Sequence, residues 1–148
     1  MPLVSVNVAA ALRLLILVST ATLLADCDGW SMDSYWHSDD YLLIAVDTKG
    51  QMNLSVDVGN GGAVGIVGPT VFSLGADDKY IVVKQHPATD HFGHIDRTVT
   101  NYFVVTRMSG PALEKENGVR GPFTKDQFDQ LVTSLSLPAF TKTFDDLN

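Results

Sequence analysis

The sequence predicts an α+β fold, mainly an antiparallel β-sheet with one amphipathic helix near the C-terminus. Short β-prone runs separated by turn residues fill residues 41–107, and a helical period follows only at 124–138. No helical segment separates the strands, so the crossover connections of a parallel sheet are missing. The pattern leaves open whether the sheet packs as a sandwich or closes into a partly open barrel.

Residues 1–26 are expected to be a signal peptide that directs export. Arg13 is the only basic residue there, and residues 14–25 are apolar apart from three small hydroxyl residues. A helix over those twelve residues would reach about 18 Å, short of the roughly 30 Å hydrocarbon layer of a membrane. The segment therefore favours a cleaved signal over a membrane span.

Cys27, the only cysteine of the chain, follows this segment directly. Leu24-Ala25-Asp26-Cys27 resembles a bacterial lipobox, whose cysteine becomes lipidated and N-terminal, although Asp26 stands where a small uncharged residue is usual. The alternative is an ordinary signal-peptidase cut after Ala25. We expect a lipidated Cys27 that anchors an exported protein to a membrane of the bacterial cell envelope, with a periplasmic or secreted protein as the alternative.

Residues 27–40 are acidic and aromatic and fit neither a helical nor a strand period, so they are expected to form a tether before a domain at 41–148. Trp30, Tyr35 and Trp36 are candidates for partner binding, because exposed aromatic rings anchor interfaces. The alternative is that these rings fold back onto the domain, since large aromatic side chains are usually mostly buried.

Several strands are expected within the domain. Met52, Leu54, Val56 and Val58 alternate with polar residues, which predicts a strand with one buried face. Asn60-Gly61 is a strong hairpin-turn signal. The other expected strands cover residues 41–46, 71–74, 79–86 and 101–107.

The helix is expected at about residues 125–136. Thr124 and Gln127 have the spacing of a capping box, and Pro138 ends the run. The apolar residues fall on one stripe that should pack on the sheet: Phe128, Leu131, Val132 and Leu135.

The connection after the strand at 79–86 gathers three of the four histidines of the chain. His86, Asp90, His91 and His94 have side chains that bind zinc or another divalent metal. Their spacing matches no established ligand pattern, so the competing interpretation is a polar loop whose histidines are solvated or bond the backbone.

Three segments, KYIVVKQHP (79–87), TNYFVV (100–105) and GVRGPFTKDQF (118–128), resemble a family of small exported bacterial proteins of unknown function, many of them predicted lipoproteins. The resemblance covers roughly the C-terminal half of the chain. It implies an envelope-facing β-rich domain with a C-terminal helix, and it carries no assigned activity.

A net charge of −7 and a pI near 4.7 argue against a nucleic-acid partner. No catalytic motif is present, and the acidic pairs 39–40, 77–78 and 145–146 are expected to be solvated. We therefore expect a non-enzymatic envelope protein without a cofactor that binds another envelope protein, for example as an inhibitor or immunity protein. The alternative is a metal-binding protein or metal-dependent enzyme that uses the loop from His86 to His94.

Overall fold

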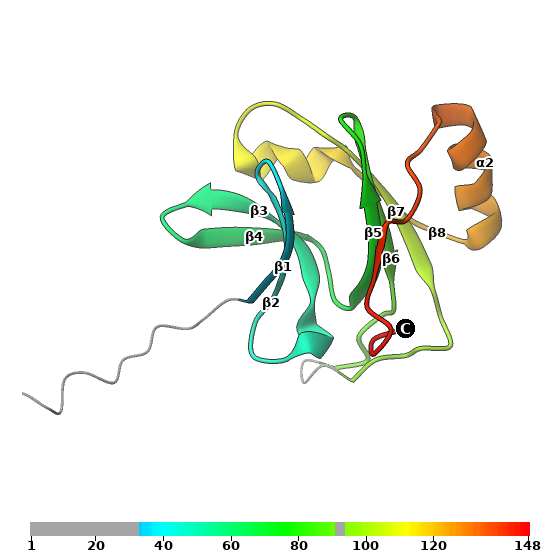
Figure 1. The fold of residues 1–148 in the computed structure, drawn as a ribbon, viewed down its shortest axis with the longest axis horizontal. Coiled ribbons are helices and arrows are strands. Elements are labelled where there is room, and N and C mark those ends of the chain that lie inside the picture. Colours follow the sequence, from blue (N-terminus) through cyan, green and yellow to red (C-terminus); the bar gives the residue numbers. More distant parts are fainter. Residues whose placement is uncertain (1–32, 91–93) are drawn as a thin grey trace, which may run out of the picture. The chain divides into compact units, whose positions relative to one another are not determined.

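A computed structural model describes residues 33–90 and 94–148, which form two antiparallel sheets and one α-helix (Figure 1). Sheet A has the strand order β1-β2-β3-β4, and sheet B has the order β8-β7-β6-β5-β9. The strands are β1 Asp33–Ser38, β2 Tyr41–Ala45, β3 Asn53–Gly59, β4 Gly62–Val67, β5 Val71–Ala76, β6 Tyr80–Gln85, β7 Asn101–Thr106, β8 Val119–Phe123 and β9 Lys142–Thr143. The predicted fold class is confirmed, and two separate sheets correspond to the sandwich alternative.

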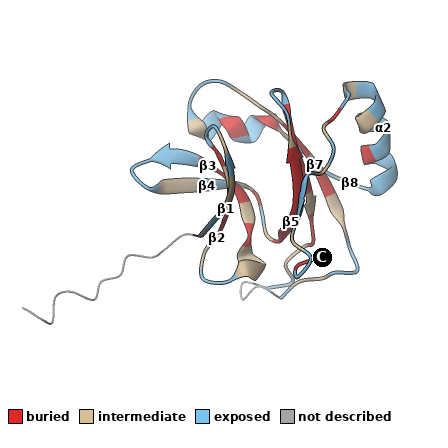
Figure 2. Cartoon of the chain, in the orientation of Figure 1, coloured by how far each residue is buried: buried red, intermediate tan, exposed pale blue. Residues whose placement is uncertain are grey.

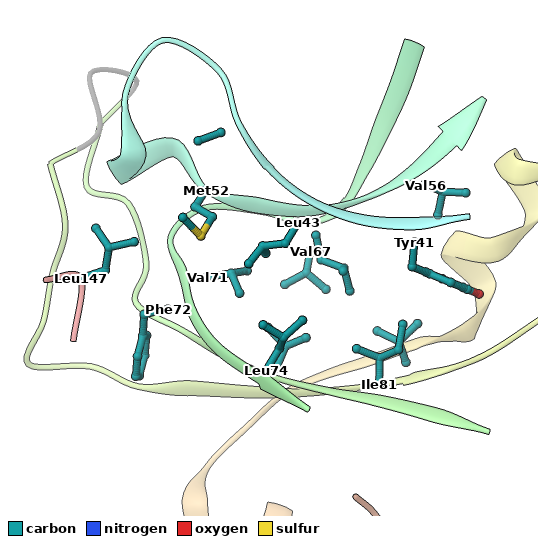
Figure 3. Packing of buried hydrophobic residues seen from close by; sticks show 14 residues of the cluster. Tyr41, Leu43, Met52, Val56, Val67, Val71, Phe72, Leu74, Ile81 and Leu147 are labelled. Atoms are coloured by element: carbon teal, nitrogen blue, oxygen red, sulfur yellow. The ribbon is translucent and has the colours of Figure 1, made fainter. Parts of the chain in front are cut away.

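The inner faces of the two sheets enclose one apolar core. Figure 3 shows Leu43 and Val67 of sheet A facing Leu74 and Ile81 of sheet B. Met52 lies at one end of this core with none of its side chain exposed. Burying each such side chain contributes about 1.5–3 kcal/mol, so this cluster is a main source of stability.

The opposite face of sheet B is covered by helix α2 (Lys125–Leu135). Thr124 and Gln127 form the predicted capping box: the Gln127 backbone N–H donates to Thr124 Oγ1 at 3.4 Å, and the Thr124 N–H donates to Gln127 Oε1 at 2.9 Å. Phe128 is buried against Tyr102, with ring centroids 5.0 Å apart. The predicted helix and its packing on the sheet are thus confirmed.

The β3–β4 hairpin extends beyond the core. Asn60 and Gly61 adopt left-handed backbone conformations (φ 55° and 76°) that place both in the turn, as the sequence predicts. The prediction that Val58 is buried is wrong, since 45% of it is exposed, whereas the polar Ser55 is buried. The pairing of β3 with β4 shifts register between Leu54 and Ser55 and again between Asp57 and Gly59, and such bulges break a strict alternation of faces.

The sheet begins earlier than the sequence predicts. Residues 33–38, expected in a tether, form β1 and pair with β2. Tyr35 and Trp36 are half-buried and pack against the core, and the Tyr35 ring meets the Phe144 ring edge-on at 5.9 Å. These two rings therefore follow the alternative interpretation, in which the aromatic residues fold back onto the domain.

The C-terminal segment ties the two sheets together along one side. β9 pairs with β5, while Lys142 Nζ of β9 donates to the Tyr35 carbonyl oxygen of β1. Leu147 is buried in the core between the sheets. Arg97 donates to the carbonyl oxygens of Asp146 and Asn148 at 2.8 and 2.7 Å, which holds this segment down.

Two short 3-10 helices complete the described residues: η2 (Lys49–Gln51) and η3 (Ala112–Gly118). Ala112 of η3 packs against the core from beside sheet A. None of the described helices is long and apolar enough to cross a membrane.

Candidate functional site

Two β-turns place four carboxylates around adjoining cavities at one end of the sheets. The turn between β1 and β2 carries Asp39 and Asp40, and the connection between β5 and β6 carries Asp77 and Asp78. Both turns lie at the same end of the two sheets (Figure 1). The two cavities measure about 390 and 330 Å³ and share Asp39, Asp78 and Arg107 in their linings. We call the four carboxylates and the space between them the acidic groove.

Arg107 forms the floor of the acidic groove. Its guanidinium donates to Asp39 Oδ2 at 2.8 Å and to Ser38 Oγ at 2.6 Å, and only 11% of its side chain is exposed. Within the described ranges, its buried Nε atom has no hydrogen-bond partner. The Arg107 backbone N–H donates to the Lys79 carbonyl at 2.9 Å, which fixes the end of β7 to the β5–β6 connection.

Lys115 of η3 is a second cation near the ring of Tyr41. Its ammonium group pairs with Asp40 and sits 5.3 Å from the centroid of the Tyr41 ring, while the Arg107 guanidinium lies 5.6 Å from the same ring. The Tyr41 hydroxyl accepts a hydrogen bond from the Met108 N–H at 3.1 Å. The two cations thus neutralise Asp39 and Asp40 from within the protein.

The other two carboxylates differ. Asp77 Oδ1 accepts hydrogen bonds from the backbone N–H groups of Tyr80 and Lys79 at 2.7 and 2.8 Å, and these bonds, with a smaller contribution from the charge of Arg107, lower the pKa of Asp77. Asp78 is exposed and, among the described residues, its carboxylate has no ion pair. Asp77 also has no ion pair among the described residues, but Asp78 is the carboxylate of the acidic groove that has neither an ion pair nor a hydrogen bond there, and we call it uncompensated.

Trp36 provides an aromatic wall beside these carboxylates. It lines the larger cavity together with Asp39, Asp77 and Asp78. An aromatic face and carboxylates both attract cations, the first through its ring quadrupole and the second through charge. The groove is therefore suited to a positively charged side chain.

The predicted histidine cluster is not brought together in the part that the structure describes. His94 is exposed, and its hydrogen bond to Asp90, with the charge of that carboxylate, raises the pKa of His94. His91 lies outside the described residues. Across residues 33–90 and 94–148, no three or more His, Cys, Asp or Glu side chains are placed to hold a metal ion.

His86 is a core residue. Its ring stacks on Phe72 with centroids 4.1 Å apart, and its Nδ1 donates to the Val99 carbonyl oxygen at 2.6 Å. Its backbone exchanges two hydrogen bonds with Thr70, so the chain continues the β5–β6 ladder at this point. His86 is thus buried, whereas 75% of the His94 side chain is exposed, so the two histidines lie in different environments.

Four predicted site residues remain, and they belong to the N-terminal part of the chain. Cys27 and Trp30 lie outside the described ranges, whereas Tyr35 and Trp36 belong to β1.

The sequence did not single out Arg107 or Lys115, and it assigned the acidic pairs to solvated turns. The pairs do lie in turns. Because β1 was not predicted, the sequence contained no sign that the turns carrying Asp39-Asp40 and Asp77-Asp78 lie beside the same cavities. One sequence signal could have suggested this arrangement: each of these two pairs comes just before a strand that begins with tyrosine, Asp39-Asp40 before Tyr41 and Asp77-Asp78 two positions before Tyr80.

The chain matches the model of the family described as "Protein of unknown function (DUF3997)" over residues 36–145, and it belongs to that family. The match covers most of the chain and runs from within β1 to the segment after β9. Comparison with curated proteins gives no match, and comparison with solved structures gives none either.

Proposed function

We propose that this chain is an exported, lipid-anchored protein of the bacterial cell envelope that binds a basic segment of another envelope protein. The observation that carries the binding proposal is the acidic groove, where Trp36 and the uncompensated Asp78 line one cavity. A lysine or arginine side chain entering there would meet an aromatic face and a carboxylate at once.

Charge supports a basic partner over an acidic one. The chain has a net charge of −7, and Arg107 and Lys115 are already engaged by Asp39 and Asp40. An anionic ligand would have to break these ion pairs, whereas a cation would find Asp78 available. The acidic surface would also speed the encounter with a basic partner at low salt.

The lipid anchor rests on the N-terminal sequence. Leu24-Ala25-Asp26-Cys27 has the arrangement of a lipobox apart from Asp26, and it follows a short apolar stretch. The acidic groove would then be presented to partners from a membrane surface.

The binding proposal is tested with a single-tryptophan form of the full chain. Trp30→Phe leaves Trp36 as the only tryptophan, so its fluorescence reports on the groove. A short lysine- and arginine-rich peptide is titrated at low salt, with a glutamate-rich peptide for comparison. We expect a saturable change with the basic peptide alone, weakened at least fivefold by Asp78→Asn.

The control is Asp145→Asn, which removes an exposed carboxylate that lines neither cavity. This variant should bind as tightly as the parent. No saturable change at millimolar peptide, or equal losses in both variants, would refute the groove as the binding site.

The anchor is tested by the intact mass of the membrane-extracted protein, compared with Cys27→Ser. A diacylglyceryl cysteine at the N-terminus supports the proposal. A free, unlipidated N-terminus at Asp26 would indicate a soluble exported protein and refute the lipid anchor. The proposal that the acidic groove binds a basic segment would be unaffected.

A further inference from the structure

Three of the four outer strands of the two sheets carry features that discourage another strand from pairing. The β1 edge is tied to β9, since Lys142 donates to the Tyr35 carbonyl oxygen. β8 contains Arg120 and Pro122, and β9 is only two residues long. Short length, charge and proline are the usual means by which proteins keep sheet edges from associating.

β4, the fourth outer strand, is six residues long and contains neither a charged residue nor a proline, although a bulge at Ile66 interrupts its pairing with β3. Among the described residues its only strand partner is β3, and no backbone hydrogen bond from a turn or loop reaches it. No residue from Val58 to Ala76 is charged. Val64 on this strand is 36% exposed, and the hairpin around it is largely exposed (Figure 2). An uncharged edge with unpaired backbone groups is a template for strand addition.

We propose that β4 pairs antiparallel with β4 of a second copy of this chain, which joins two copies of sheet A into one continuous sheet. Each copy carries a net charge of −7, so two copies repel at most surfaces. The uncharged edge is where that repulsion is smallest. A twofold axis brings identical strands together antiparallel, so β4 alone supplies both halves of the interface.

The first test measures self-association of the purified full chain in mild detergent by sedimentation velocity from about 1 to 100 µM. We expect a monomer–dimer equilibrium that Val64→Lys weakens at least tenfold. Thr133→Lys, on the exposed face of α2, is the matched control and should associate like the parent. A monomer at all concentrations would overturn the proposal, and so would a Val64→Lys variant that associates normally.

The second test does not depend on a disruptive substitution. In a Cys27→Ser chain, cysteine is placed in turn at Ala63, Val64, Gly65 and Ile66, and the chains are mildly oxidised. Facing residues of antiparallel strands have Cα atoms about 4.5–5.5 Å apart, within the range of a disulfide. A twofold axis through the paired strands sets one residue opposite itself.

At least one of these variants should therefore form a covalent dimer, whereas Thr133→Cys should stay monomeric. Failure of all four would place any association elsewhere and overturn the proposal. The proposal would also be overturned if the purified chain is a monomer that captures another protein and Val64→Lys abolishes that capture. The β4 edge would then bind a different partner. Neither result bears on the acidic groove, which is tested by peptide binding.

Discussion

Among the described residues, sheet B contributes to two apolar clusters, one on each face, whereas sheet A contributes to one. In β6, Ile81 and Val83 belong to the core between the sheets, while Tyr80 and Val82 belong to the cluster under α2. In sheet A, β3 leaves the core after Val56, and its last residues are exposed. The difference indicates that substitutions on either face of sheet B should be costly, whereas the end of the β3–β4 hairpin should tolerate them.

The largest expected effect comes from uncovering the outer face of sheet B. Phe128→Ala removes the buried ring that α2 places against Tyr102 and Phe140. We expect the free energy of unfolding to fall by about 3–5 kcal/mol, measured by urea denaturation of the full chain. Gln130→Ala on the exposed side of the same helix should change it by less than about 0.5 kcal/mol. A loss below about 1 kcal/mol for Phe128→Ala would show that α2 adds little to sheet B.

A glycine gives the next largest effect, because it allows the chain after α2 to lie directly on β5. A Cβ atom at Gly75 would overlap the Ala139 carbonyl oxygen and lie 2.8 Å from the carbonyl carbon. Backbone cannot move aside as a flexible side chain does, so Gly75→Ala should cost about 3 kcal/mol in the same measurement. Gly68→Ala is the control, since a Cβ there meets nothing within 4 Å. Equal stability of the two variants would contradict the close packing at Gly75.

A matched pair on β3 tests the boundary between the covered and the exposed parts of sheet A. Val56 is fully buried and Val58 is exposed, only two positions further along the strand. Val56→Thr should cost about 1–3 kcal/mol, because it buries a hydroxyl group. Val58→Thr should change the free energy of unfolding by no more than about 0.5 kcal/mol. Comparable costs at both positions would mean that the hairpin is covered as far as its tip.

The smallest effect is expected at the turn that joins β5 to β6. Asp77→Ala removes an acceptor of two backbone hydrogen bonds and should cost about 1 kcal/mol at pH 7. Because folding lowers the pKa of Asp77, its contribution is present above the ordinary value of 3.8 and is lost as the pH falls through the folded value.

The unfolding free energies of parent and Asp77→Ala should therefore converge in acid, which a series of denaturation curves from pH 7 to pH 2 would reveal. Asp145→Ala serves as the control and should track the parent throughout. A constant difference across this range would mean that the Asp77 carboxylate is not the source of the effect.

Local signals predicted the parts of the fold that local chemistry determines. The capping box at Thr124 and the turn at Asn60-Gly61 were read correctly because each depends on neighbouring residues alone. The continuous apolar run of β6 was equally clear, and only the structure explains it, as burial on both faces.

Elements that depend on distant partners were not predictable. β1 pairs with β2 through a shifted register between Ser34 and Trp36, so its apolar residues do not alternate. β8 and β9 are short, and long-range pairing with β7 and β5 defines them. The candidate site also depends on distant partners. The sequence showed two acidic turns, but it could not show that their carboxylates line one cavity together with Arg107.

The burial of Leu147 also sets the order in which this protein can fold. Leu147 shares the central core with Tyr41 and Met52, so that core is incomplete until the chain has been synthesised as far as residue 147 (Figure 3). Contacts this far apart in the sequence form slowly, because a long loop must close first. The central core of the sandwich therefore cannot close until residue 147 is available to pack against residues more than 90 positions earlier in the chain.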